Sequence, residues 1–285
     1  MTDKKKTHRL KRVSKMLLLL GGLSALSVAA QPLEDLQQLR ARYKQVFPHL
    51  TLADYAQGVY ALDPIAKQSW EAIEEFPPYV PSLEQGKLLF HRPFKNGQQY
   101  GNCFAQQGLG IAHLYPKWDS KTQQVQTLAG AINQCRVKNG LPALNYETGE
   151  ITALLAYMAF TSRGHAISVT IPNEPAALAA YEQGKHYYYQ RRGQLNFACA
   201  TCHVENAGKR LRAEVLSPLI GHSSGWPTYR LKWGEMGTLQ RRIIGCHQQI
   251  RAEVEPAESQ TLRQLEYFLT FMSNGVPITG PSTRK

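Results

Sequence analysis

Several features are scarce in this chain of 285 residues, and each scarcity narrows the possible protein classes. After residue 30 no apolar run is long enough to cross a bilayer, so we predict no membrane span in the mature chain. Half of the net charge of +12 lies in the first fifteen residues, and the later basic residues form no block, so nucleic acid is not a predicted partner. Strand patterns are sparse as well. With 43% apolar residues, the chain therefore predicts a folded and mainly helical protein.

The N-terminus combines a basic start with an apolar run from Met16 to Ala30, followed by Gln31 and Pro32. This order is typical of a secretory signal peptide, with cleavage predicted after Ala30. The alternative is an uncleaved anchor helix, but a run of this length covers only ~22 Å of a ~30 Å hydrocarbon core. We therefore expect residues 1–30 to be a signal peptide and the mature protein to be exported to a compartment where thiols can oxidise.

Cysteine is also scarce, and the five cysteines are Cys103, Cys135, Cys199, Cys202 and Cys246. Residues 199–203 spell CxxCH, the attachment motif of a c-type haem, in which both thiols bond to vinyl groups and the adjacent His203 becomes the proximal iron ligand. A redox CxxC or half of a zinc site would use the same thiols, but neither a βαβ setting nor a second ligand pair is visible. The motif therefore predicts covalently bound haem c.

Internal similarity indicates a tandem duplication. The tetrapeptide GluGlnGlyLys occurs at 84–87 and again at 182–185, shortly before Cys103 and Cys199 respectively. Apolar helical patterns at 154–164 and 265–275 align without gaps, and each ends at a glycine suited to a C-cap. We predict an all-α fold of two tandem cytochrome c-like domains, residues 31–170 and 171–285.

Further helices are predicted at 34–47 and at 174–190, the second with Asn173 as its N-cap and Pro175 in its first turn. The segment from Ser168 to Pro175 is the predicted linker between the domains. The stretch from Gln31 to about Pro81 precedes the first repeat, and we expect it to wrap that repeat.

The first copy of the repeat lacks most of the haem motif. Where the second copy has Cys202 and His203, the first has Gln106 and Gln107, so we predict a first domain without haem and one haem in total. Cys103 and Cys135 are then free to form a disulfide, which would close a loop of about 32 residues and contribute roughly 3 kcal/mol. The alternative is two separate buried thiols.

Cys246 is left over in the haem-bearing half, and an iron ligand is a natural use for it. The rival sixth ligands are Met236, Met272, His222 and His247. Of these, Met272 lies in an apolar helical stripe and is expected in the core, and Met236 lies in a loop after Trp233.

Three segments, 229–233, 237–253 and 272–281, resemble the SoxA family of periplasmic c-type cytochromes, the L-cysteine S-thiosulfotransferases of sulfur oxidation. The resemblance implies that Cys246 ligates the iron and carries the reactive sulfur as a persulfide, and that Arg242 binds substrate. It also implies that this chain belongs to a single-haem branch in which Cys103 and Cys135 form a disulfide.

Elementary chemistry supports these roles. In a helix, Arg242 and Cys246 lie one turn apart on one face, so the guanidinium can hold an oxyanion of thiosulfate while the sulfane sulfur faces the cysteine. The alternative is that Arg242 is a solvated charge, as we expect for its neighbour Arg241. Other cations that would enlarge a positive funnel are Lys209, Arg212, Lys232 and Arg251.

Two functions therefore remain in view. The first is haem-dependent oxidative coupling of thiosulfate to a cysteine of a carrier protein, and the second is simple electron transfer by a periplasmic cytochrome c. A peroxidase is a distant third, since it would need an open iron position. For the first function, the resemblance implies a SoxX-type cytochrome partner in a heterodimer and a SoxYZ-type sulfur carrier.

Overall fold

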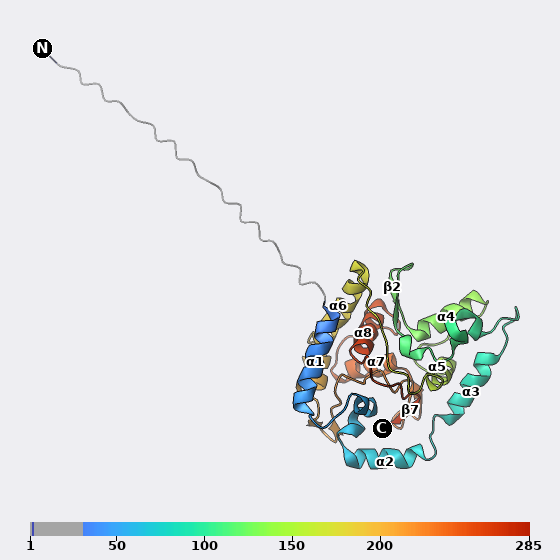
Figure 1. The fold of residues 1–285 in the computed structure, drawn as a ribbon, viewed down its shortest axis with the longest axis horizontal. Helices are drawn as coiled ribbons and strands as arrows, with labels where there is room; N and C mark the ends of the chain where they lie inside the picture. Colours follow the sequence, from blue (N-terminus) through green and yellow to red (C-terminus); the bar gives the residue numbers. More distant parts are fainter. Residues whose placement is uncertain (1, 3–30) are drawn as a thin grey trace.

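Residues 2 and 31–285 are described by a computed structural model, which is mostly helical (Figure 1). The predicted signal peptide and its cleavage site lie outside the described residues. Among the helices that are described, none has the length and apolar character needed to cross a membrane.

The secondary structure consists of medium-length helices joined by short strands and turns. The α-helices are α1 (Pro32–Val46), α2 (Pro64–Glu74), α3 (Val80–His91), α4 (Leu128–Lys138), α5 (Glu150–Phe160), α6 (Pro175–Tyr189), α7 (Leu239–Gln249) and α8 (Gln260–Phe271). The strands are β1 (Lys117–Asp119), β2 (Gln124–Gln126), β3 (Arg210–Leu211), β4 (Glu214–Val215), β5 (Thr228–Arg230), β6 (Glu235–Gly237) and β7 (Ser282–Arg284). They are too short to form the core, so the prediction of a mainly helical fold is confirmed.

A pair of crossed helices forms the centre of each repeat: α3 packs against α5, and α6 packs against α8. The repeated GluGlnGlyLys motif places a glycine at each crossing. A Cβ atom at Gly86 would lie 1.9 Å from the carbonyl oxygen of Ala153, and one at Gly184 would lie 2.1 Å from that of Gln264. The glycines therefore allow the backbones to approach more closely than any side chain would permit.

The later elements of the two repeats also correspond. The antiparallel hairpin β1–β2 matches β5–β6, each of which leads into a helix, α4 or α7. Thr127 caps the first of these helices and Thr238 the second, each accepting a hydrogen bond from a backbone N–H three residues on. In the second copy β7 adds in parallel to β5 and forms a sheet of order β6-β5-β7.

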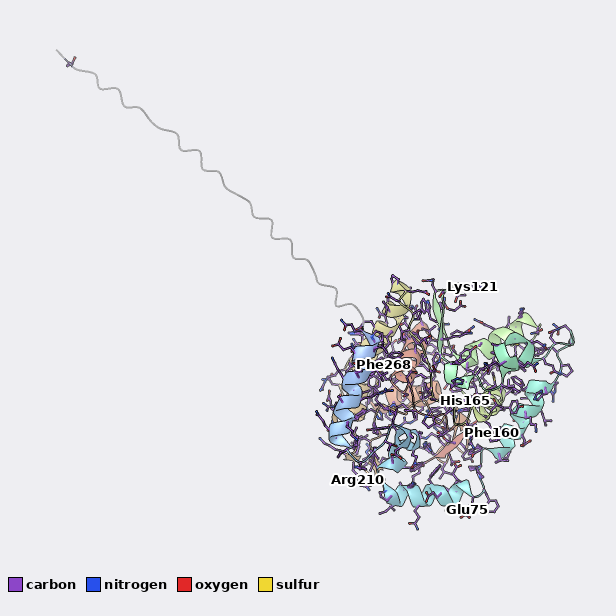
Figure 2. All side chains as sticks on the ribbon, in the orientation of Figure 1. Glu75, Lys121, Phe160, His165, Arg210 and Phe268 are labelled. Carbon is purple, nitrogen blue, oxygen red and sulfur yellow. A yellow bond between two sulfur atoms is a disulfide. The ribbon has the colours of Figure 1, made fainter. Side chains whose placement is uncertain are left out.

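The buried apolar residues form two main clusters, each built around one of the two helix pairs. One cluster contains residues of α3, α4 and α5, including Ile132 and Ile151, which are fully buried. The other contains residues of α6 and α8, including Tyr181 and Phe268. Phe268 is labelled in Figure 2, on the side of the molecule where α1, α6 and α8 lie together, away from α3 and α4 (Figure 1).

The segment before the first repeat does not pack as expected. The buried side chains of α1, Leu36, Leu39 and Tyr43, belong to the cluster of the second half, so the expectation that this stretch wraps the first repeat is wrong for α1. Polar contacts reinforce the packing, because the Tyr181 hydroxyl donates to Asp35 at 2.8 Å. The amphipathic pattern of α1 shows that one face is buried, but it contains no information about which half buries it.

The predicted linker is part of the packed structure. The N–H of Ser168 donates to the carbonyl of His113 at 2.9 Å. The Asn274 side chain accepts a hydrogen bond from the N–H of Val169 and donates one to its carbonyl. Helix α6 begins at Pro175, one residue later than predicted, and its N-cap is Glu174 without a side-chain hydrogen bond, so the prediction of Asn173 as N-cap is wrong.

A cavity of about 90 Å³ lies where the two halves meet. Its walls include Tyr115 and Leu128 from the first half and Trp226, Glu258 and Glu266 from the second. The halves also share a polar contact at its edge, since the Thr127 hydroxyl donates to Glu258 at 2.7 Å.

Candidate functional site

Helix α7 positions the two residues on which the predicted chemistry depends. Thr238 caps the first turn, and residues 239–249 are helical, so the condition under which Arg242 and Cys246 share one face is met. Arg242 and Cys246 therefore lie one turn apart, and Nη1 of Arg242 donates a hydrogen bond to Sγ of Cys246 at 2.7 Å. Both side chains are half-buried, so a small ligand can still reach them.

The CxxCH residues lie within interaction range of Cys246. Burial, with a smaller contribution from Cys246, raises the pKa of Cys199 to about 12. Burial and Cys246, in that order, also raise the pKa of Cys202. Cys246 therefore interacts electrostatically with both predicted thioether cysteines.

His203 is held in the orientation expected of a metal ligand. Its Nδ1 lies 2.7 Å from the main-chain oxygen of Ser217, so a proton on Nδ1 satisfies this bond and leaves the lone pair of Nε2 free. Burial lowers the pKa of His203 to about 4, which keeps the imidazole neutral at physiological pH. A neutral imidazole with a free Nε2 is the form that binds iron.

Two buried side chains of the second half, His247 and Tyr188, have polar groups without a partner among the described residues. Within residues 31–285, neither ring nitrogen of the buried His247 has a hydrogen-bond partner, and the buried hydroxyl of Tyr188 also has none. Such groups are costly in a protein interior unless something else pairs with them. The donor set, two thiols and an adjacent imidazole, suits a thioether-linked porphyrin, so the residues present fit haem c.

No bare-metal site competes with this assignment. Among the described residues, no group of three or more His, Cys, Asp or Glu side chains is arranged to hold a metal ion.

The rival iron ligands have other surroundings. Met236 is 3% exposed and belongs to a small cluster with Tyr79 and Ala156 of the first half. Met272 lies in the core of the second half, where its sulfur accepts a hydrogen bond from Tyr181 at 3.7 Å. His222 stacks edge-on against His203, with 4.3 Å between the ring centres.

The other predicted cations are not all part of the site. Arg241 is not simply solvated, because it pairs with Glu235 at 2.9 Å and lies over the Trp233 ring at 4.3 Å. The four remaining candidates for a positive funnel, Lys209, Arg212, Lys232 and Arg251, are exposed.

Sequence reasoning missed Arg230, which ends strand β5. Its pKa is lowered to about 10, first by burial and then by the positive charge of Arg242, while Cys246 acts in the opposite direction. Arg230 therefore lies within interaction range of both site residues. An alignment of 115–119 with 226–230 would have flagged it, because the first copy has Asp119 at the equivalent position.

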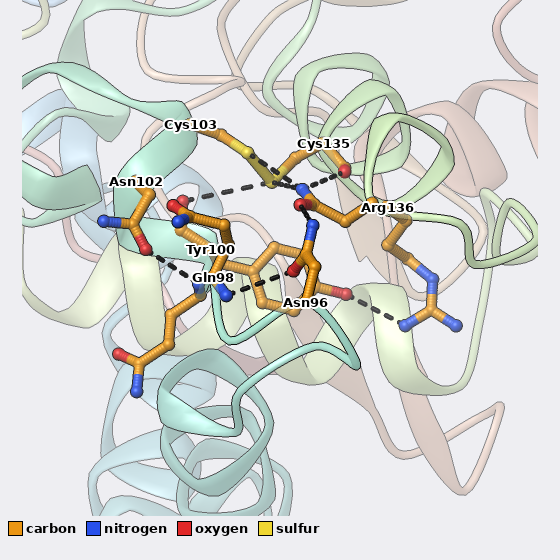
Figure 3. Close-up of a disulfide and its surroundings, with 9 residues drawn as sticks. Asn96, Gln98, Tyr100, Asn102, Cys103, Cys135 and Arg136 are labelled. Carbon is orange, nitrogen blue, oxygen red and sulfur yellow. Dashed lines mark hydrogen bonds between the residues drawn. A yellow bond between two sulfur atoms is a disulfide. The ribbon is translucent and has the colours of Figure 1, made fainter.

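In the first half the equivalents of Cys199 and Cys246 are bonded to each other. Cys103 and Cys135 form a disulfide with Cα atoms 5.8 Å apart (Figure 3). Nδ2 of Asn139 donates to the carbonyl of Cys135 at 2.8 Å, and the buried Tyr100 accepts a hydrogen bond from Arg136 at 2.9 Å beside it. The first half therefore cross-links the two cysteines that correspond to Cys199, the first residue of the CxxCH motif, and to Cys246.

The helical fold and the CxxCH site define a c-type cytochrome domain, and comparison with known proteins specifies which kind. A family model described as "SoxA/TsdA, cytochrome c domain" matches residues 85–167 and 183–278. The chain belongs to this family, and the resemblance seen in its sequence is confirmed.

Two relatives illustrate the similarity. The L-cysteine S-thiosulfotransferase subunit SoxA of Allochromatium vinosum is 50% identical over 258 residues, covering 90% of this chain and 92% of that protein. The subunit of the same name from Chlorobaculum thiosulfatiphilum is 45% identical over 251 residues, covering 88% and 87%. Among solved structures, SoxXA from P. pantotrophus matches with a TM-score of 0.70 and 31% identity, covering 76% of this chain and 84% of that one.

Proposed function

We propose that this protein is an L-cysteine S-thiosulfotransferase subunit that couples thiosulfate oxidatively to a cysteine of a sulfur-carrier protein in the periplasm. The observation that carries the proposal is the hydrogen bond of 2.7 Å between Arg242 and Cys246 beside the CxxCH residues. This contact supports the assignment of Arg242 as the anion-binding group and of Cys246 as the nucleophilic sulfur. The names of the relatives support the same assignment.

The overall reaction joins one thiosulfate dianion to one carrier thiol. A sulfur–sulfur bond forms between the sulfane sulfur and the cysteine sulfur, the S–H bond breaks, and one proton leaves to solvent. Two electrons are released; a haem held by Cys199 and Cys202 would supply a one-electron acceptor at the site, and a SoxX-type cytochrome partner would be the final recipient of both electrons. The family likeness to SoxXA supports this partner.

Cys199 and Cys202 would hold the haem covalently, and His203 and Cys246 would ligate its iron. When bound, the haem supplies a one-electron acceptor beside the reacting sulfur. Arg242 binds an oxyanion of thiosulfate and turns the sulfane sulfur toward Sγ of Cys246. The first sulfur–sulfur bond forms there, and the carrier thiolate then attacks the sulfane sulfur and displaces the Cys246 thiolate.

The domain assignment is part of the proposal. Residues 31–170 form a cytochrome c-like domain without haem, and residues 171–285 form the domain with one haem. The disulfide between Cys103 and Cys135 supports this division, because both of its cysteines correspond to haem-flanking cysteines of the second half. Residues 1–30 are proposed as the signal peptide that takes the chain to the periplasm.

A reconstituted coupling assay tests the function. The purified holoprotein is mixed with thiosulfate, a SoxYZ-type carrier and a partner cytochrome, and the carrier mass is measured. We expect a mass increase on the carrier that corresponds to one bound thiosulfate and depends on the holoprotein. Haem reduction without any modified carrier would instead favour a simple electron-transfer cytochrome.

A further inference from the structure

A short turn of the chain, residues 217–222, orients the imidazole of His203. Nδ1 of His203 lies 2.7 Å from the main-chain oxygen of Ser217. The hydroxyl of the same serine lies 3.2 Å from Nε2 of His222, and among residues 31–285 this is the one hydrogen bond that the hydroxyl makes. Ser217 therefore joins two histidines, one through its main chain and the other through its side chain.

His222 also contacts His203 directly. The two ring centres lie 4.3 Å apart and the ring planes are inclined by 88°, which is an edge-to-face arrangement. This contact restricts rotation of the His203 ring, while the hydrogen bond to Ser217 fixes the direction of Nδ1. His222 thus touches both the predicted iron ligand and the residue that orients it.

The main chain of His222 is anchored independently of its ring. Its N–H donates to the carbonyl of Leu219 at 3.1 Å, and its carbonyl accepts a hydrogen bond from the indole of Trp226 at 2.8 Å. The preceding Gly221 donates its N–H to the hydroxyl of Ser273, just after α8, at 3.0 Å. The imidazole of His222 therefore extends from a fixed position on the backbone.

The first half lacks this histidine. Residues 110–116 align without gaps with residues 221–227, since each segment begins at a glycine with positive φ and ends at a proline. The alignment places Ile111 at the position of His222. Ile111 is 3% exposed and packs in the apolar cluster of α3, α4 and α5. The turn therefore accepts an apolar residue in the half with the disulfide, and the imidazole occurs in the half with CxxCH.

We propose that His222 is a positioning residue for His203 and acts on it through Ser217. This inference rests on the proposed function and its haem site, and it specifies what sets the electron affinity of that site. A carbonyl that accepts the Nδ1 proton raises the donor strength of the opposite ring nitrogen, and a stronger donor favours ferric over ferrous iron. By bonding the hydroxyl of Ser217 and packing against the His203 ring, His222 keeps that carbonyl and the imidazole aligned.

The test measures the midpoint potential and the electron paramagnetic resonance of the oxidised holoprotein, without thiosulfate or carrier. His222→Phe keeps an aromatic ring but cannot bond Ser217, whereas His222→Gln retains a group that can. Ser217→Ala removes the hydroxyl and keeps the main-chain oxygen that faces His203. Trp226→Phe is the matched control, because it removes the hydrogen bond to the His222 carbonyl and leaves the imidazole in place.

The midpoint potential should rise in His222→Phe, and the g values of the oxidised haem should change, because the bond from Nδ1 of His203 to Ser217 loses its alignment. Ser217→Ala should shift the potential in the same direction. The double variant should shift it no further than His222→Phe alone, since the two residues act along one path. His222→Gln should return both readouts towards the wild type, and Trp226→Phe should match the wild type in both.

Three results would overturn the inference. The first is an unchanged potential and unchanged g values in His222→Phe. The second is an equal shift in Trp226→Phe, which would assign the effect to general loosening of the turn. The third is loss of the low-spin spectrum in His222→Phe, which would make His222 an iron ligand itself. Failure of the proposed function is distinguishable, because it appears as no modified carrier in the coupling assay of the wild type.

Discussion

The two halves of this molecule share one architecture but differ at the positions that bear chemistry. In the second half Cys199 and Cys246 are separate and lie beside Cys202 and His203, whereas in the first half Cys103 and Cys135 are bonded to each other. The crossed helices, the hairpin and the Thr-capped helix are present in both.

This difference separates the shared scaffold from the residues that bear chemistry. The glycine contacts at Gly86 and Gly184 are similarly tight, so the two halves bring their paired helices together in the same way. A serine just after the end of α5 and of α8 plays the same part in both halves. Ser162 and Ser273 each accept a hydrogen bond from a backbone N–H of another segment. A disulfide in the first half can supply stability where a covalent cofactor would otherwise cross-link the chain.

The largest expected effect comes from Cys246→Ala. The variant should keep its haem, because the thioether bonds do not involve this residue, but the low-spin spectrum should change. Coupling of thiosulfate should fall by more than about 10³-fold because the proposed nucleophile is missing. Absorption spectroscopy and the carrier-mass assay measure the two effects separately. A wild-type spectrum in this variant would assign the sixth ligand to Met236 or a histidine.

Arg242→Ala should have the next largest effect. Removing the proposed oxyanion clamp should reduce kcat/KM for thiosulfate by roughly 10²-fold, equivalent to about 3 kcal/mol of transition-state stabilisation. The haem spectrum should stay as in the wild type. Arg241→Ala is the matched control and should alter kcat/KM by less than about 3-fold, because its ion pair with Glu235 is partly exposed. Equal losses in both variants would mean that general positive charge, and not Arg242 itself, serves the substrate.

Loss of the disulfide in the first half should change the stability of the protein and leave its haem unaffected. Replacing both Cys103 and Cys135 by Ser should lower the free energy of unfolding by about 2 to 5 kcal/mol. Denaturant unfolding of the holoprotein measures this loss. Haem content and the haem spectrum should be unchanged, and a loss of haem would show that the domains are misassigned.

A pH dependence of stability is also expected at the cavity between the halves. Burial raises the pKa of Glu266 to about 8, with a further contribution from Glu258. An unfolded glutamate titrates near pH 4.3, so the native state binds more protons between about pH 4 and pH 8. The free energy of unfolding should therefore fall as pH rises through this window. Glu266→Gln should flatten this slope, and an unchanged slope would contradict the assignment.

The site was largely predictable because its chemistry is local in sequence. CxxCH occupies five consecutive residues, and Arg242 and Cys246 need only one helical turn to meet. The tandem duplication was predicted from the repeated tetrapeptide and the matched apolar patterns, but the close contact between the paired helices was not. The family was predicted from the resemblance of three segments, two of which lie close to Arg242 and Cys246.

What could not be predicted depends on contacts between distant segments. The pattern of α1 shows a buried face but does not specify the half that covers it, and Tyr43 in fact contacts the main chain at His203 and Leu219. Arg230 was missed because its proximity to Arg242 depends on how β5 lies beside α7. The cap at Glu174 departs from the expected Asn173 because Trp118 and Ser120 of the first half both donate to the Glu174 carboxylate.

One measurement tests the central claim, that a single haem site lies in the second half and a disulfide replaces it in the first. Intact-mass analysis of the mature protein, followed by peptide mapping without reduction, counts haems and cross-links together. The account predicts one haem on the peptide containing Cys199 and Cys202, one bridge between Cys103 and Cys135, and Cys246 in no bridge to another cysteine. Two haem masses, or a haem attached through Cys103, would contradict it.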